Sequence, residues 1–274
     1  MPEAAAALGV LAVAVLVVTV LVRQVSRARM RRFDALFTAA EAMQGKTSPS
    51  TSTASGSRRG LAVTFSLTSR GSGSGAEAWT EIDVVRPATS LVLELRPERR
   101  HERRLKERSL TVDVETGDPA FDGAFLVEAA PADVARALLD ADVRARLLAL
   151  APVAIAPAHG WLRLEKRGWI EEPAVVVEAI DLAATIAARI PAAFAAADAA
   201  LERAAGSPYR PELDAGDARS AKQRRDEEVA ELRARKERRR AWERRNLFLY
   251  GGAFLALVAV AALLNVLGVV KCNG

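Results

Sequence analysis

Two aspartates beside a glycine, in the stretch TGDPAFDGAF (116–125), are the residues whose spacing comes nearest to a metal site. A calcium loop of the EF-hand type needs oxygen ligands at its first, third and fifth positions, glycine at the sixth and glutamate at the twelfth. Counted from Asp118, Asp122 and Gly123 fit, but the third and twelfth positions are alanines. Gly-Asp-Pro and Asp-Gly also favour turns. The pattern therefore favours a turn between two elements, and leaves Asp118 and Asp122 as the candidate metal ligands.

Other residue types that could do chemistry are few and far apart. The chain has one cysteine, Cys272, and two histidines, His101 and His159, which leaves little for a zinc site or a Ser-His-Asp arrangement. The arginine-rich run 96–108 could bind phosphates, but no aromatic residue is interleaved with it for base stacking, so a solvated loop is favoured. The sequence therefore predicts no catalytic residue, no cofactor and no nucleic-acid partner.

Both ends of the chain have the length and apolar character of transmembrane helices. Residues 4–22 and 247–270 contain no charged residue. As helices they would span roughly 28 and 36 Å, against a hydrocarbon core of about 30 Å. Arginine and lysine gather on the inner side of both segments, which predicts a two-pass protein of a bacterial inner membrane with both termini outside and the central domain cytoplasmic. The residues expected at the membrane surface are Arg27, Arg31, Arg32, Arg239, Arg240, Trp242, Arg244 and Arg245.

Between the ends, short β-rich runs alternate with two amphipathic helices. This pattern predicts the α+β class, with a mostly antiparallel sheet covered by the two helices and flanked by one transmembrane helix at each end. The predicted segments are 1–22 (transmembrane helix), 23–60 (juxtamembrane helix and Ser/Thr/Gly linker), 61–205 (α+β domain), 206–246 (charged helical stalk) and 247–270 (transmembrane helix).

The predicted stalk is rich in charge and poor in apolar residues. Glu231 and Arg235 lie at the spacing of an ion pair along a helix. Its apolar positions, Val229 and Leu232, do not continue into a heptad repeat. A single solvated helix is therefore favoured over a coiled coil.

The stretch 116–150 resembles uncharacterised bacterial membrane-anchored proteins whose cytoplasmic domain carries a Phe-Asp-x-x-Phe turn before a helix. The residues that carry the resemblance are TGDPAFDGAFLVEA, the helix ALLDADVRARLLAL and the Gly-Trp strand that follows. The resemblance covers about Leu61 to Ile190 and implies a membrane-anchored cytoplasmic domain. No activity comes with it, so it assigns no site residue.

The leading functional hypothesis is a membrane-tethered cytoplasmic interaction or scaffold domain without catalytic activity. Its expected partners are the lipid bilayer with its anionic headgroups, and a protein partner or a second copy bound through the transmembrane helices. Two alternatives stay open. One is a membrane-bound, divalent-metal-dependent enzyme that uses the acidic turn at 118–128, and the other is a signalling relay through the charged stalk.

Overall fold

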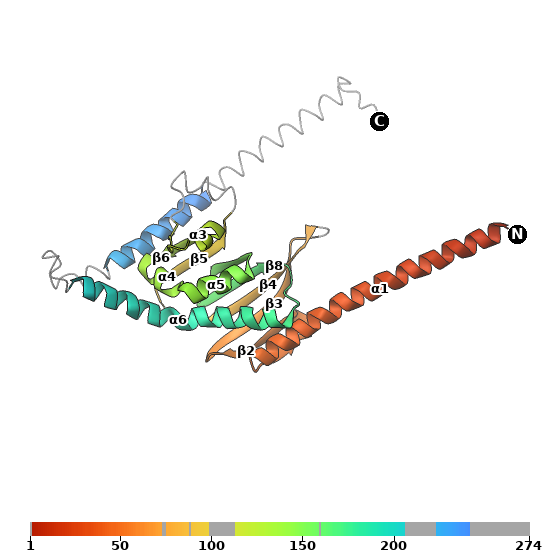
Figure 1. The fold of residues 1–274 in the computed structure, drawn as a ribbon, viewed down its shortest axis with the longest axis horizontal. Helices are drawn as coiled ribbons and strands as arrows, with labels where there is room; N and C mark the ends of the chain where they lie inside the picture. Colours follow the sequence, from red (N-terminus) through yellow and green to blue (C-terminus); the bar gives the residue numbers. More distant parts are fainter. Residues whose placement is uncertain are drawn as a thin grey trace, which may run out of the picture.

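The computed structural model describes residues 2–72, 75–87, 89–98, 113–158, 160–205 and 223–241 (Figure 1). These residues form an 8-stranded antiparallel sheet with the strand order β1-β2-β3-β4-β8-β7-β5-β6, so the expected α+β class and antiparallel pairing are present. The strands are β1 (Lys46–Ser48), β2 (Thr53–Arg58), β3 (Leu61–Arg70), β4 (Glu77–Val85), β5 (Val92–Pro97), β6 (Phe125–Ala130), β7 (Val153–Ala158) and β8 (Trp161–Arg167). The helices are α1 (Pro2–Ala42), η1 (Pro49–Thr51), α3 (Pro119–Ala124), α4 (Ala132–Leu138), α5 (Ala141–Leu150), α6 (Pro173–Ala205) and a further helix over 223–241.

The two faces of the sheet differ because side chains alternate along each strand. On β3, Val63 and Phe65 are buried, whereas Thr64 between them is only partly buried. The register pairs Phe65 with Ile82 and Val63 with Val84 of β4, so the apolar residues of neighbouring strands lie on the same face. This core face carries the hydrophobic core, and the outer face is polar.

Four helical segments cover the core face, two more than the sequence predicts. The helix α6 crosses the sheet beside α4 and α5 (Figure 1), and Ile180, Ala183 and Ile186 of α6 are fully buried. The last turns of α1 complete the layer, because Leu36 and Met43 also belong to the core. The Ala-rich sequence of α6 suits this position, since small side chains allow a helix to approach a sheet closely.

The expected Ser/Thr/Gly linker is instead the first hairpin of the sheet. Its strands β1 and β2 pair in register and pass beneath the end of α1, where the backbone nitrogen of Ser57 donates to the carbonyl of Met43 at 2.7 Å. A Cβ atom on Gly45 would lie 1.9 Å from the carbonyl oxygen of Ser55, and one on Gly56 would lie 2.4 Å from that of Met43. The small residues that suggest a linker therefore permit this close backbone packing.

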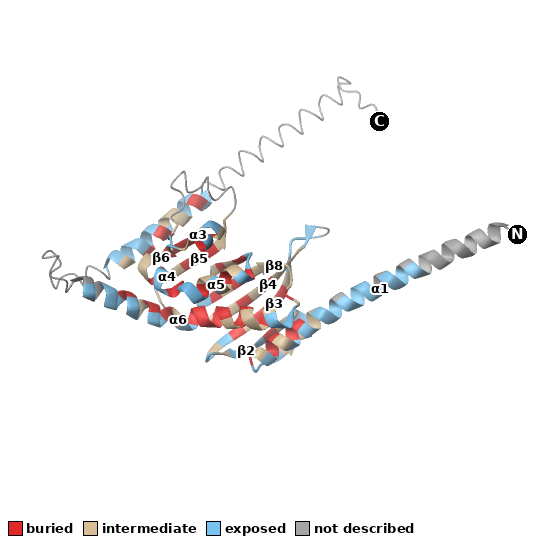
Figure 2. Cartoon of the chain, viewed as in Figure 1, coloured by how far each residue is buried: buried red, intermediate tan, exposed pale blue. Residues whose placement is uncertain are grey.

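The described helices do not match the predicted membrane architecture. Among the described residues, none of the helices combines the length and the apolar character needed to cross a bilayer. The flanking transmembrane helices and the two-pass inner-membrane placement are therefore wrong for this part of the chain. The described apolar side chains of α1 between Leu16 and Val22 are exposed, as is most of the described part of α1 outside the domain (Figure 2). Arg23 and further arginines follow at once in the sequence. The second expected span, 247–270, lies outside the described residues.

Candidate interaction site under the 223–241 helix

The 223–241 helix lies along β5 and β6, at the end of the sheet (Figure 1). Most of its contacts come from one stripe of side chains, spaced four, three, four and three residues apart: Arg225, Val229, Leu232, Lys236 and Arg239. This spacing places the five on one helical face. Because the helix packs on the sheet and not on another helix, the described residues contain neither the solvated stalk nor the coiled coil that the sequence suggests.

Two glutamates of the sheet form the centre of the site. Glu94 of β5 and Glu128 of β6 are directly opposite in the register, on the outer face, where like charges repel. Lys236 donates to Glu94 at 2.6 Å, and Arg239 donates to both oxygens of Glu128 at 2.7 and 2.9 Å. Arg96 lies 3.6 Å from Glu94 and 3.5 Å from Glu128. Three cations thus compensate two carboxylates.

Burial makes this compensation necessary. Glu128 is 2 % exposed and Arg239 is 7 % exposed, so both charges have lost most of their hydration and depend on each other. Burial of the Glu94 carboxyl opposes its ionisation, but the nearby charges of Lys236, Arg96 and Arg239 outweigh this and hold the pKa of Glu94 below its ordinary value. The site is therefore built for a positively charged helix.

The first half of the helix is held by another ionic contact. The Arg225 guanidinium donates to Asp133 of α4 at 2.9 Å and also to Asp198 of α6. Burial lowers the pKa of Arg225, but the hydrogen bonds from these two carboxylates outweigh it and raise that pKa above its ordinary value. Between the ionic contacts, Val229 and Leu232 pack on a small apolar cluster at the edge of the sheet.

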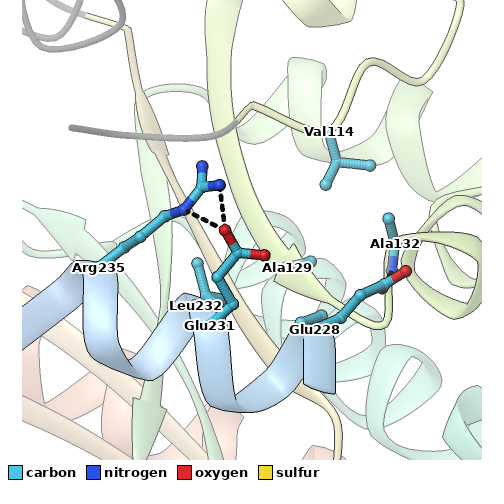
Figure 3. A pocket seen from close by; sticks show the side chains of 8 residues that line it. Val114, Ala129, Ala132, Glu228, Glu231, Leu232 and Arg235 are labelled. Atoms are coloured by element: carbon cyan, nitrogen blue, oxygen red, sulfur yellow. Dashed lines mark hydrogen bonds and ion pairs between the residues drawn. The ribbon is translucent and has the colours of Figure 1, made fainter. Parts of the chain in front are cut away.

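A cavity of about 230 Å³ lies between the 223–241 helix and the body of the protein (Figure 3). The helix contributes Glu231 and Arg235, which form an ion pair, and Glu228, whose carboxylate accepts from the backbone nitrogen of Ala132 at 3.3 Å. The full lining is Val114, Ala129, Ala130, Ala132, Glu228, Glu231, Leu232 and Arg235. Small apolar side chains form the wall opposite the helix, and the charged side chains belong to the helix.

The acidic turn lies away from this cavity, and local donors engage its carboxylates. Asp118 is the N-cap of α3, where it accepts from the backbone nitrogens of Ala120 and Phe121 and from Arg144 at 3.2 Å. The hydrogen bond from the Phe121 nitrogen is the main reason that the pKa of Asp118 lies below its ordinary value, and Arg144 adds to it. Asp122 accepts from the backbone nitrogen and hydroxyl of Thr116 at 3.0 and 2.8 Å.

No metal site forms around these aspartates in the described part of the chain. The described residues contain no group of three or more His, Cys, Asp or Glu side chains that could hold an ion. Beneath the turn, the rings of Phe121 and Phe125 lie 5.1 Å apart and both residues are buried. The turn therefore works as a capping structure over a small aromatic pair.

The expected membrane-surface residues are in several environments. Arg27 and Arg240 are exposed. Arg31 lies 4.0 Å from Glu171, and the Arg32 guanidinium stacks over the Trp169 ring at 3.3 Å from its centroid, where burial lowers the pKa of Arg32. Arg239 is part of the buried ionic cluster. Outside the described residues lie Trp242, Arg244, Arg245, both histidines, Cys272 and most of the basic run.

Comparison with known proteins assigns no family, because no protein-family model matches the chain and the search of curated proteins gives no significant match. The fold and the site by themselves define an α+β protein that holds a basic helix against the outer face of its sheet. Sequence reasoning missed Glu94 as a site residue, and it considered Glu128 only as part of the acidic turn of the metal-enzyme alternative. Their signal is present in the sequence as two glutamates within otherwise apolar strand runs, LVLEL and FLVEA, where a charge needs a partner.

Proposed function

We propose that this protein is a non-catalytic interaction module that binds a basic amphipathic helix on the outer face of β5 and β6. Its own 223–241 helix occupies this face. The observation that carries the proposal is the contact between Arg239 and the buried carboxylate of Glu128, two residues 111 positions apart in the chain. Such a carboxylate needs a cation to be buried without a large cost, so the face selects a helix that supplies one.

The composition of the contact supports exchange of one helix for another. Val229 and Leu232 are the apolar residues of the helix that become buried, whereas Arg225, Lys236 and Arg239 make ionic contacts. Taking charges out of water costs free energy that offsets much of their mutual attraction, so these partly buried ionic contacts contribute little net stabilisation. A helix held in this way can leave, and a partner helix with the same stripe can take its place.

A partner helix must compete with the 223–241 helix of the same chain for the outer face of β5 and β6. The 223–241 helix is tethered through residues 206–222, and a tethered ligand acts at an effective concentration on the order of millimolar. A partner must therefore bind more tightly than the helix of the chain, or bind after that helix has been released. The metal-enzyme alternative has less support, because Asp118 and Asp122 are already engaged by local donors.

The proposal is tested with a fluorescent peptide of residues 223–241 and the full-length chain. Arg239→Glu places a carboxylate against Glu128, so the helix of the chain is released and the face becomes available. The peptide is expected to bind this variant at least about tenfold more tightly than it binds the wild type, measured by fluorescence anisotropy, because the tethered competitor is gone.

Arg240→Glu is the matched control, since Arg240 carries the same charge one position along the helix and is exposed. It is expected to behave as the wild type. A second variant, Arg239→Glu combined with Glu128→Gln, removes the charge that the peptide recognises and is expected to bind it weakly. Equal binding of the peptide to R239E, R240E and the wild type would contradict the proposal.

A further inference from the structure

We propose that the cavity beneath the 223–241 helix is a binding site for a small apolar cation, an arylalkyl ammonium of about nine non-hydrogen atoms, which fastens the helix to the sheet. The inference rests on the proposed docking of this helix, because the cavity exists only when the helix is in place. It adds a ligand to that interaction. The observations that carry it are the volume of the cavity, its apolar wall and the charge balance of its helical side.

The size and lining of the cavity select the body of the ligand. Its volume of about 230 Å³ gives room for a ring such as benzene, which binds in an engineered apolar cavity of roughly 150 Å³, and the site opens to solvent beside Glu231, whose side chain is 59 % exposed. One wall consists of small apolar side chains, among them Val114, Ala129 and Ala132, and Leu232 adds an apolar residue from the helix (Figure 3). A phenyl ring with a short alkyl chain fits this space, whereas a sugar or a nucleotide would leave its polar groups without partners.

The charged residues select the sign of the ligand. Glu228 and Glu231 are three positions apart on the helix and both line the cavity, while Arg235 is the single cation among the described residues that line it. Each carboxylate has one oxygen engaged, Oε2 of Glu228 by the Ala132 nitrogen and Oε1 of Glu231 by Arg235. With two negative charges against one positive charge, an ammonium group completes the balance and a carboxylate is repelled.

Ligand binding and helix docking are coupled through this geometry. The apolar wall belongs to the body of the protein and the charged side belongs to the helix, so a ligand in the cavity contacts both (Figure 3). A ligand that binds only the docked state increases the docked population by a factor of one plus its concentration divided by its dissociation constant. The cation therefore opposes the release of the helix that partner binding requires.

The experiment measures amide hydrogen exchange in residues 223–241 of the full-length chain with three probes of matched size. Phenethylammonium, 2-phenylethanol and phenylacetate differ mainly in the charge of the head group. At ten times its dissociation constant, phenethylammonium is expected to slow exchange roughly tenfold, the alcohol less and the acid not at all. Equal effects of the three probes would overturn the charge argument and with it the proposal.

Two variants locate the effect in the cavity. Ala132→Leu fills the cavity from the first residue of α4 and is expected to abolish the effect of phenethylammonium. Ala141→Leu makes the same change at the first residue of α5, outside the cavity, and is expected to retain it. Glu231→Gln keeps the volume and is expected to remove most of the preference for the cation over the alcohol. Protection that persists in A132L would overturn the proposal.

The same experiment separates the two proposals. If residues 223–241 exchange as fast as a free peptide without any probe, the helix is not docked and the proposed function fails. If the helix is protected without a probe but phenethylammonium leaves its exchange unchanged, docking stands and the ligand site alone is refuted.

Discussion

The core face and the outer face of the sheet each hold a helix, but by different forces. On the core face, α6 buries a continuous apolar stripe that includes Ile180, Ile186 and Ile190 against strand residues such as Phe65 and Leu164. On the outer face, the 223–241 helix buries a stripe that alternates between ionic and apolar contacts. Apolar burial is non-directional and is not screened by salt, whereas ion pairs need a defined geometry and are screened.

Of these two helices, α6 is needed for the fold, and the 223–241 helix takes part in the proposed interaction. Removing α6 would expose most of the core, so this helix is needed for the folded state. The contact of the 223–241 helix leaves the core intact when it opens, because its apolar cluster is separate from the main one. A helix that can leave without unfolding the domain is suited to exchange.

The largest expected effect comes from removing a ring from the core face. Phe65→Ala is expected to lower the free energy of unfolding by about 3–5 kcal/mol, because Phe65 is fully buried and its loss leaves a cavity. The measurement is urea unfolding of the full-length chain. Thr64→Ala, the neighbouring residue on the outer face of the same strand, is the control and is expected to cost less than about 1 kcal/mol. Similar losses from both variants would remove the distinction between the faces.

An ionic cluster at the rim of the core face predicts a dependence on acid. Burial opposes ionisation of Asp181, but hydrogen bonds from Arg59, Arg146 and Arg58 outweigh it and lower the pKa of Asp181 to about 2. Since this pKa is below the unfolded value, the stabilisation is complete above about pH 4 and is lost as pH falls toward 2. The expected loss is about 2 kcal/mol.

Asp181→Asn tests this assignment, because the amide does not titrate in this range. Unfolding of the wild type and the variant is compared at a series of pH values between 5 and 2. The difference in stability between them is expected to shrink as pH falls. A difference that stays constant over the series would show that Asp181 is not responsible.

Salt is expected to act on the outer face with a smaller effect. Raising the ionic strength from 0.1 to 1 M shortens the screening length from about 10 to about 3 Å. The contact of Arg225 with Asp198, whose side chain is 58 % exposed, is open to this screening. Docking of the 223–241 helix is expected to weaken by about 1 kcal/mol, seen as about fivefold faster amide exchange there. Exchange in β3 and β4 should stay unchanged, and parallel changes in both regions would argue against separate forces.

The smallest effect is expected from an exposed ion pair of the outer face. Arg167 contacts Glu77 at 2.5 Å, with side chains 62 % and 44 % exposed. Arg167→Ala is expected to change the free energy of unfolding by less than about 0.5 kcal/mol. Arg163 on the same strand, bonded to Asp83 at 2.6 and 2.8 Å and less exposed, is the comparison, and Arg163→Ala is expected to cost more. Thermal unfolding of both variants measures the two losses of stability. A larger loss from R167A than from R163A would contradict the expected order.

Much of the fold was predictable because it depends on local patterns. The alternation in LAVTFSL predicts a strand with one buried face. The spacing of Leu139, Val143 and Leu147 predicts one helix with an apolar side, but the structure has two helices here, because α4 ends at Leu138 and α5 begins at Ala141. The turn at 116–125 was also predictable, since Asp118 and Asp122 accept hydrogen bonds from donors at most six residues away in the chain. The exception is Arg144, which also donates to Asp118. Local periodicity and turn chemistry contain enough information for such elements.

The site could not be predicted in the same way. The stripe from Arg225 to Arg239 has heptad spacing, but three of its five members are charged, so a search for apolar residues does not find it. The stripe is recognised as a contact surface only through its partners Glu94 and Glu128, which lie more than 100 positions away from Lys236 and Arg239. The two-pass membrane prediction failed for a related reason. It judged helices by the hydropathy of a local run, whereas α1 continues through its arginines into the core of the domain.

The sequence by itself determined the α+β class, the buried face of strands such as β3 and the capped acidic turn, because these follow from interactions between residues close in the chain. The tertiary structure decided that residues 46–58 pair as strands beneath α1, and that a charged helix lies on a pair of buried glutamates. Both depend on contacts between distant segments. A charge or a glycine in the sequence has the same appearance whether water or another segment surrounds it, and only folding determines which of the two it meets.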